Sequence, residues 1–301
     1  MIQYNNIVDA IVALTQKYGI EIFNSTPRFI SLLSDWTPNL PEEQHIIRRF
    51  SRANGMIAVA GGITEHKQYT SVLSAICSTA VQASKDDLER HAMVRIAKDI
   101  LGALDKEYST PANPKSVFEC GMEYYRRPPK EENIPIAILI LEDAGQSGFT
   151  DALYYISNSY LKGKGIQQDS EKGLQYLELA AKNNNKRAKL ELAEYLWKGI
   201  NVDQDAGRAV SLLKDLDDPN AMYMLGEIFR ENAEYTKAFE YYVLAAEKNH
   251  VYAQYDTAIA YATGQGTKRN IQEAKRWLHS AASLGHSEAR RKLEELGEKW
   301  D

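Results

Sequence analysis

The feature that most constrains this chain is a small residue that recurs about every 36 positions. The members of this column are Ser116, Ala152, Ala188, Ala221, Ala253 and Ala289, with steps of 36, 36, 33, 32 and 36 residues. Four positions after each member stand Cys120, Ile156, Leu192, Leu225, Thr257 and Leu293. Residues four apart lie on one face of an α-helix. A repeat of this length predicts stacked copies of one helical unit.

The second half of each unit repeats as well. Small residues at Ala137, Gly173, Ala209, Ala238 and Ala274 are followed three positions later by Ile140, Tyr176, Leu212, Tyr241 and Trp277. Small residues on one helix let large side chains of a neighbouring helix approach and interlock. Each unit is therefore predicted to be a helical hairpin, and the fold class is all-α.

Glycine and asparagine mark the predicted helix ends. The first helix of two units ends at Gly163-Lys164-Gly165 and Gly264-Gln265-Gly266. The second helices end at Gly148, Asn184, Asn249 and Gly285. Helix C-termini commonly need a residue with positive φ, which glycine and asparagine adopt most easily. Because no apolar strand precedes these glycine pairs, they indicate helix stops and not nucleotide-binding loops.

Residues 160–169 and 258–286 resemble Sel1-like repeats, whose unit runs A-x-x-x-L-G-x-x-Y-x-x-G-x-G and then K-A-x-x-W-x-x-K-A-A-x-x-G. The resemblance covers about residues 114–300. It implies an α-solenoid of about five Sel1-like hairpins over 116–301, closed by a polar capping helix from Ser287 to Trp300.

Three units depart from the pattern. The unit from Ser116 is the weakest, with Arg126-Arg-Pro-Pro-Lys130 in place of the glycines. The unit from Ala188 lacks three residues after its second helix. The unit from Ala221 lacks four between its helices and reads there like a tetratricopeptide repeat. Both deletions are expected to shorten turns and to leave the packed positions intact.

Residues 1–107 lack the repeat and are predicted to form a separate small helical domain, joined by a linker at 108–115. Helices are expected from Ile7 to Gly19, from Thr26, and from Pro41 to Gly55. Residues 56–64 fit either a short helix or a hairpin. Two longer helices are expected over 65–84 and 86–106, the second opened by a Ser84-x-x-Asp87 capping pattern.

Composition excludes several classes of function. A net charge of −5 and a pI near 5.8 argue against a dedicated nucleic-acid binder. No apolar run reaches the ~18 residues of a membrane span, and the N-terminus lacks the features of a secretory signal. Two cysteines, Cys77 and Cys120, fit a reducing cytosol, so a cytoplasmic location is expected.

No catalytic, cofactor or metal signature is found. The six histidines show no ligand spacing, and neither cysteine stands in a sequence context that would activate a thiol. Both cysteines are interpreted as core residues. The chain is therefore predicted not to be an enzyme and to need no cofactor or metal.

A protein or peptide is the expected partner, because proteins that resemble this family commonly act as adaptors. In helical-hairpin solenoids the first helix of each unit lines the concave surface, so its exposed side chains are the predicted contacts. They are Phe118, Tyr125, Tyr154, Asn158, Glu194, Trp197, Tyr223, Glu227, Arg230 and Tyr255. Each aromatic at the ladder position shared by Phe118, Tyr154, Tyr223 and Tyr255 has an alternative explanation, packing against the neighbouring hairpin. Trp197 is the strongest candidate, because no internal column requires a large residue there.

A second hypothesis assigns the activity to residues 1–107, as a nucleic-acid-binding or enzymatic effector docked by the repeats. It predicts a basic stripe built from Arg48, Arg49, Arg52, Arg90 and Arg95. The alternative explanation of Arg48, Arg49 and Arg52 is a solvated helix face.

Overall fold

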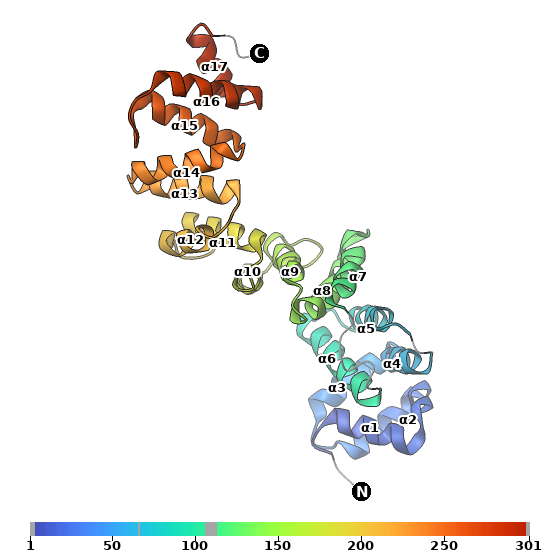
Figure 1. Ribbon diagram of the computed structural model, residues 1–301. Helices are drawn as coiled ribbons and strands as arrows, with labels where there is room; N and C mark the ends of the chain where they lie inside the picture. Colours follow the sequence, from blue (N-terminus) through green and yellow to red (C-terminus); the bar gives the residue numbers. More distant parts are fainter. Residues whose placement is uncertain (1–3, 66, 106–112, 299–301) are drawn as a thin grey trace. The chain divides into compact units, whose positions relative to one another are not determined.

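The computed structural model describes residues 4–65, 67–105 and 113–298, and within these ranges all regular structure is helical, without strands (Figure 1). The chain divides into an N-terminal unit, Met1–Tyr176, and a C-terminal unit, Leu177–Asp301. Most of the linker expected at 108–115 lies outside the described residues. The predicted domain division therefore stays a prediction.

The N-terminal unit begins with helices close to the predicted ones, together with a 3₁₀ helix that was not predicted. They are α1 (Ile7–Tyr18), the 3₁₀ helix η1 (Ile20–Asn24), α2 (Thr26–Trp36), α3 (Pro41–Arg52), α4 (Gly55–Thr64), α5 (Tyr69–Ala83) and α6 (Asp87–Leu104). The ambiguous segment 56–64 is thus helical. A Cβ at Gly62 would stand 2.8 Å from the side chain of Val72. This glycine therefore lets α4 pack closely against α5.

The start of α6 differs in detail from the predicted capping pattern. Asp86, and not Ser84, caps the helix, because its Oδ1 accepts the backbone N–H of Glu89 at 2.8 Å. The Ser84 hydroxyl accepts the N–H of Asp86 and donates to the Glu89 carboxylate at 2.5 Å. Ser84 therefore supports the cap from two positions before it.

The first two hairpins complete the N-terminal unit. They consist of α7 (Pro114–Arg126) with α8 (Lys130–Gln146), and α9 (Thr150–Lys162) with α10 (Ser170–Lys182), whose last residues belong to the C-terminal unit. One apolar core runs from Ile7 in α1 to Tyr160 in α9. Helix α5 packs against both α7 and α8. The N-terminal helices thus cover the first hairpin and shield its apolar face from water.

The C-terminal unit continues the hairpins with α11 (Lys186–Lys198), α12 (Ala206–Leu213), α13 (Pro219–Glu231), α14 (Tyr235–Glu247), α15 (Val251–Thr263), α16 (Ile271–Ser283) and α17 (Ser287–Glu295) (Figure 1). The predicted small column is its core, since Ala188, Ala221, Ala253 and Ala289 are fully buried. The fold class is an α-solenoid, as predicted.

The turn glycines have a second structural role besides ending a helix. Gly264 ends α15 with φ +79°, as expected for a left-handed cap. Gly266 has a second role, because a Cβ there would stand 2.1 Å from the carbonyl oxygen of Tyr235. A Cβ at Gly165 would likewise stand 2.7 Å from the carbonyl oxygen of Lys130. The second glycine therefore lets each turn touch the second helix of the preceding hairpin.

The three-residue deletion in the unit from Ala188 shortens a helix. Helix α12 has 8 residues, whereas α14 and α16 each have 13. The expectation that only a turn would shorten is wrong here. Pro219 opens α13, and Asp218 before it is extended, so the preceding helix cannot run past residue 217. Leu216 is nevertheless buried in the connecting segment.

Candidate partner-binding surface

The first helices of the C-terminal hairpins carry six of the ten predicted contact residues. Trp197 on α11 is partly exposed, and its indole Nε1 donates to Glu231 on α13 at 2.7 Å. The Lys198 ammonium lies 5.6 Å from the indole centroid. Glu194 accepts a hydrogen bond from Lys198 at 2.5 Å. The hydrogen bond to Glu231 thus fixes the orientation of the Trp197 ring and links α11 to α13.

Glu227 and Arg230 form a paired site on α13. The guanidinium donates to both carboxylate oxygens, at 3.0 and 2.8 Å, and the Tyr242 hydroxyl also donates to Glu227. Burial opposes ionisation of Glu227, but the Arg230 and Tyr242 hydrogen bonds outweigh it and lower its pKa. Two-point pairing of this kind fixes geometry as well as charge. The Arg230 side chain remains 47% exposed.

Asp256 on α15 is one of the residues of this surface that the predicted contacts did not include, as are His250, Tyr252 and His286. Burial, reinforced by the negative charge of Glu227, raises its pKa to about 6. A hydrogen bond from Tyr223 offsets part of this cost. No Lys, Arg or His nitrogen among the described residues lies within 4 Å of the carboxylate. Asp256 is therefore a partly buried acid without an ion pair in that part of the chain, although the charge of Arg230 lowers its pKa to a small extent. In the sequence, only its position beside Tyr255 pointed to it.

Aromatic rings form a strip over α13, α15 and α17. Tyr223 stacks on His250 at 4.4 Å between centroids, and Tyr255 stacks on His286 at 4.5 Å. Tyr252 is 61% exposed, and its ring centroid lies 6.2 Å from that of His250 and 5.4 Å from that of His286. The alternative explanation of the aromatic ladder therefore applies in part, since both stacked tyrosines pack on the next hairpin while staying partly exposed.

Both histidines cap a helix, which determines where their protons lie. The Nδ1 atoms of His250 and His286 accept the backbone N–H groups of Ala253 and Ala289, each at 3.2 Å. An imidazole that accepts at Nδ1 is neutral and carries its hydrogen on Nε2. Burial also lowers the pKa of both rings. Each ring thus presents one N–H donor, and the two donors are one repeat apart.

The four predicted contacts in the N-terminal unit are placed differently. Tyr125 is 6% exposed and packs edge-on against Tyr155, while Asn158 is 9% exposed and donates to the carbonyl of Tyr154 at 3.2 Å. The expectation that these two lie on an open surface is wrong, because the first two hairpins bury them. Phe118 packs on Phe149 at 4.4 Å, and Tyr154 is partly exposed.

A partly buried polar network in the N-terminal unit also escaped sequence reasoning. His91 lies 2.8 Å from the Glu142 carboxylate, and Lys98 pairs with Asp143. Lys172 and the Tyr160 hydroxyl bind Asp87 at 2.5 and 2.8 Å. Further hydrogen bonds join Tyr69 to Asp143 and Tyr176 to Glu142. Since Asp87 and Asp143 each face a lysine and Glu142 binds His91 and Tyr176, the network holds α6 against the hairpins.

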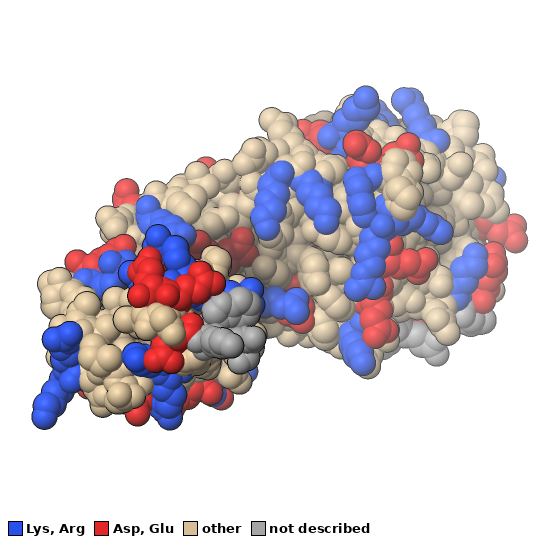
Figure 2. Space-filling view, turned by 90° about the horizontal axis from the view of Figure 1, so that it is seen from above, with Lys and Arg blue, Asp and Glu red and all other residues tan. Residues whose placement is uncertain are grey.

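The predicted basic stripe of residues 1–107 is largely used within the protein. Arg48 donates to Ser34 and Gln44, Arg49 to Glu89 and the Ala83 carbonyl, and Arg90 to the Ser84 carbonyl. Arg48 and Arg49 are partly exposed and also hydrogen-bond within the protein, so the alternative of a solvated face applies to them only in part, whereas Arg52 is exposed. Figure 2 shows acidic side chains beside the basic ones on the face that it presents. These contacts weaken the effector hypothesis.

The cysteine interpretation holds for Cys77, which is fully buried, and burial raises the pKa of its thiol. Cys120 is only partly buried, and burial raises its pKa too. Among the described residues, no group of three or more His, Cys, Asp or Glu is placed to hold a metal ion. In the same ranges, no helix is long and apolar enough to cross a membrane.

Comparison with known proteins identifies the repeats. The Sel1 repeat family model matches residues 150–185, 186–214, 219–250 and 251–286. The hairpin of α7 and α8 lies outside these matches. A crystal structure of a Sel1 repeat protein from Oxalobacter formigenes has a TM-score of 0.53 and 22% identity, covering 64% of this chain and 82% of that one. It supports the fold alone.

Two curated relatives share part of the chain. The exopolysaccharide production negative regulator of Rhizobium leguminosarum bv. viciae is 26% identical over 192 residues, 63% of this chain and 62% of that protein. The DAP3-binding cell death enhancer 1 of Rattus norvegicus is 32% identical over 103 residues, 33% of this chain and 20% of that protein. The chain thus spans less than two thirds of either relative. Sel1 repeat proteins generally mediate protein–protein interactions. Residues 150–286 of this chain are Sel1 repeats.

Proposed function

We propose that this protein is a non-catalytic adaptor that binds a segment of another polypeptide on the first helices of its C-terminal hairpins. The observation that carries the proposal is the strip of partly exposed rings formed by Tyr223, His250, Tyr252, Tyr255 and His286. Aromatic side chains are favoured at protein interfaces because they bury much area with few rotatable bonds. Packing within the unit already orients four of these five rings, so binding costs little further entropy.

The polar groups beside the strip suit a peptide backbone. The Nε2–H groups of His250 and His286 are donors that peptide carbonyl groups accept. Trp197 adds a large apolar surface, with its own N–H already satisfied by Glu231. Asp256 forms no ion pair within 4 Å among the described residues, and the more distant Arg230 offsets only part of the rise in its pKa, so its carboxylate favours a segment that carries a lysine or an arginine.

Affinity capture with matched variants tests this function. The full chain is used as bait in an extract of the native cells, beside Tyr252→Ala, Trp197→Ala and a control, Leu244→Ala. Leu244 lies on α14 and is 44% exposed, so its loss removes a similar apolar side chain outside the first helices. Loss of an interface anchor typically costs about 2 kcal/mol, roughly 30-fold in affinity. The proposal expects the first two variants to lose partners that the control retains. If both retain every partner of the unaltered chain, the proposed surface is wrong.

A further inference from the structure

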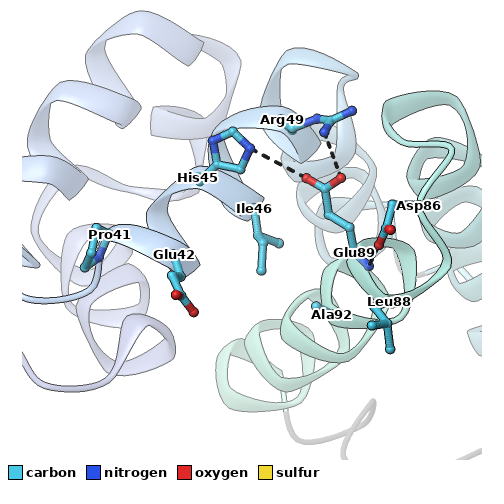
Figure 3. Close-up of a pocket in the computed structure, with 9 residues that line it drawn as sticks. All are labelled: Pro41, Glu42, His45, Ile46, Arg49, Asp86, Leu88, Glu89 and Ala92. Carbon is cyan, nitrogen blue, oxygen red and sulfur yellow. Dashed lines mark hydrogen bonds and ion pairs between the residues drawn. The ribbon is translucent and has the colours of Figure 1, made fainter.

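The N-terminal unit carries an apolar groove outside the repeats, between α3 and α6, which pack against each other. Pro41, Ile46, Leu88 and Ala92 supply its apolar lining, and its volume is about 590 Å³. In Figure 3, Ile46 stands between the two helices, with Glu42 on the α3 side and Leu88 on the α6 side. Leu88 is 80% exposed. A leucine this open in the first turn of a helix gains nothing from the fold, since the cap is supplied by Asp86.

Ion pairing makes one end of this groove rigid. Arg49 from α3 and Ser84 bind the same oxygen of Glu89, at 2.8 and 2.5 Å. His45 lies 3.8 Å from the other oxygen, and Figure 3 shows the contacts of Arg49 and His45 with this carboxylate. These contacts hold α3 against α6 in the unbound protein. They also neutralise Arg49, the guanidinium that lines the groove.

The charge left on the rim is negative. Glu42 is exposed and pairs with no other described residue, and Asp86 is engaged only by backbone N–H at the start of α6. Charge complementarity therefore favours a basic partner. A second copy of this chain would bring the same two carboxylates near each other in a two-fold contact, which disfavours self-association.

We propose that this groove binds an amphipathic helix of another protein, with apolar residues at i and i+4 against Ile46, Leu88 and Ala92 and a lysine or arginine beside Glu42 and Asp86. A helix fits because two adjacent helices leave a trough that takes the apolar stripe of a third. An extended segment that binds by strand pairing would need a sheet edge, and the described part of this unit has none. The proposal is independent of the function assigned to the repeats.

Selection from a peptide library tests it with the full-length protein. A phage library of randomised single helices is selected on the unaltered chain, after depletion on Leu88→Glu. The expected consensus has leucine or isoleucine at i and i+4 with a flanking lysine or arginine. Binding of the selected peptide is then measured by fluorescence polarisation to Leu88→Ala, Glu42→Lys and a control, Leu284→Ala, whose leucine is 49% exposed in the C-terminal unit.

The proposal expects Leu88→Ala to weaken binding at least about tenfold, because most of the leucine surface is buried in the complex. Glu42→Lys is expected to weaken the basic peptide and to strengthen a version with glutamate in place of its lysines, whereas Leu284→Ala leaves both unchanged. Three outcomes overturn it: no enriched peptide that depends on Leu88, an acidic or extended consensus, or a dimer of the unaltered chain that Leu88→Glu dissociates in sedimentation.

Discussion

Replacing Asp256 by asparagine is expected to stabilise this protein and to weaken its binding of a basic partner. Asp256 is a partly buried carboxyl whose pKa stands at about 6, against an ordinary value of 3.8. Ionising it in the folded state therefore costs about 1.4 kcal/mol for each unit of difference, or roughly 3 kcal/mol in all at neutral pH. Asparagine has the same shape, keeps an acceptor for Tyr223 and carries no charge.

The sign of the effect depends on pH. Since the folded pKa is raised, the folded state holds its proton more tightly than the unfolded state between pH 3.8 and 6. The penalty is therefore absent below pH 3.8, grows as the pH rises to 6 and is complete above it. Asp256→Asn should raise the free energy of unfolding by roughly 2–3 kcal/mol at pH 7.5 and by much less at pH 4.5.

Chemical denaturation followed by circular dichroism at the two pH values measures this difference. Asp217→Asn is the control, because that carboxylate is exposed and bound by Lys248 at 2.7 Å. The reasoning is refuted if Asp256→Asn destabilises the chain at pH 7.5, or if the stabilisation is the same at both pH values. A carboxylate that lowers the stability of the fold is expected at a position where it contributes to binding.

Three further predictions follow from the contacts described above. Gly266→Ala should lower the free energy of unfolding by about 3 kcal/mol in the same denaturation assay, because the new Cβ combines positive φ with a clash against the Tyr235 carbonyl oxygen. Gly285 also has positive φ but open space around it, so Gly285→Ala should lower the free energy of unfolding by only about 1 kcal/mol. The lowered pKa values of His250 and His286 mean that their contribution to stability is complete above the unfolded pKa of about 6.5 and is lost as the pH falls through the folded values. The protection factors of the α15 and α17 amides, which correct for the intrinsic slowing of exchange in acid, should therefore fall as the pH drops, and His250→Asn with His286→Asn should remove this sensitivity while keeping the caps. Burial lowers the pKa of His91, but Glu142 and Asp87 outweigh burial and raise it. The contribution of His91 to the stability of the N-terminal unit should therefore be present below pH 6.5 and be lost as the pH rises through its folded pKa. A His91→Gln variant that keeps the full pH dependence of α6 amide exchange would contradict this.

The solenoid was predictable because the same pattern of small and large residues recurs in every unit of the sequence. Each column of small and large residues is sampled five or six times in the sequence, so Ala188, Ala221 and Ala253 identify the core together. Helix ends followed from glycine and asparagine, whose positive φ has a local cause. The second glycine of each turn was only half understood, since its role is contact with the preceding hairpin.

The remaining features depend on pairs that are distant in the sequence and occur once. Lys98 meets Asp143 across 45 residues, and Lys172 meets Asp87 across 85. Nothing in the local pattern around any of these four residues marks a partner. The burial of Tyr125 and Asn158 has the same origin, because the packing of the first two hairpins decides it. The groove between α3 and α6 was equally hidden, since residues 1–107 offer no repeat with which to compare Leu88.

Site-specific photo-crosslinking on the C-terminal hairpins tests the adaptor function most directly. A benzophenone amino acid is placed at Tyr252 in one full-length variant and at Leu244 in another, and each is irradiated in native extract. The account predicts a discrete, protease-sensitive polypeptide adduct from position 252, lost on adding Tyr255→Ala and absent from position 244. Equal adducts from both positions, or adducts from 244 alone, would contradict it.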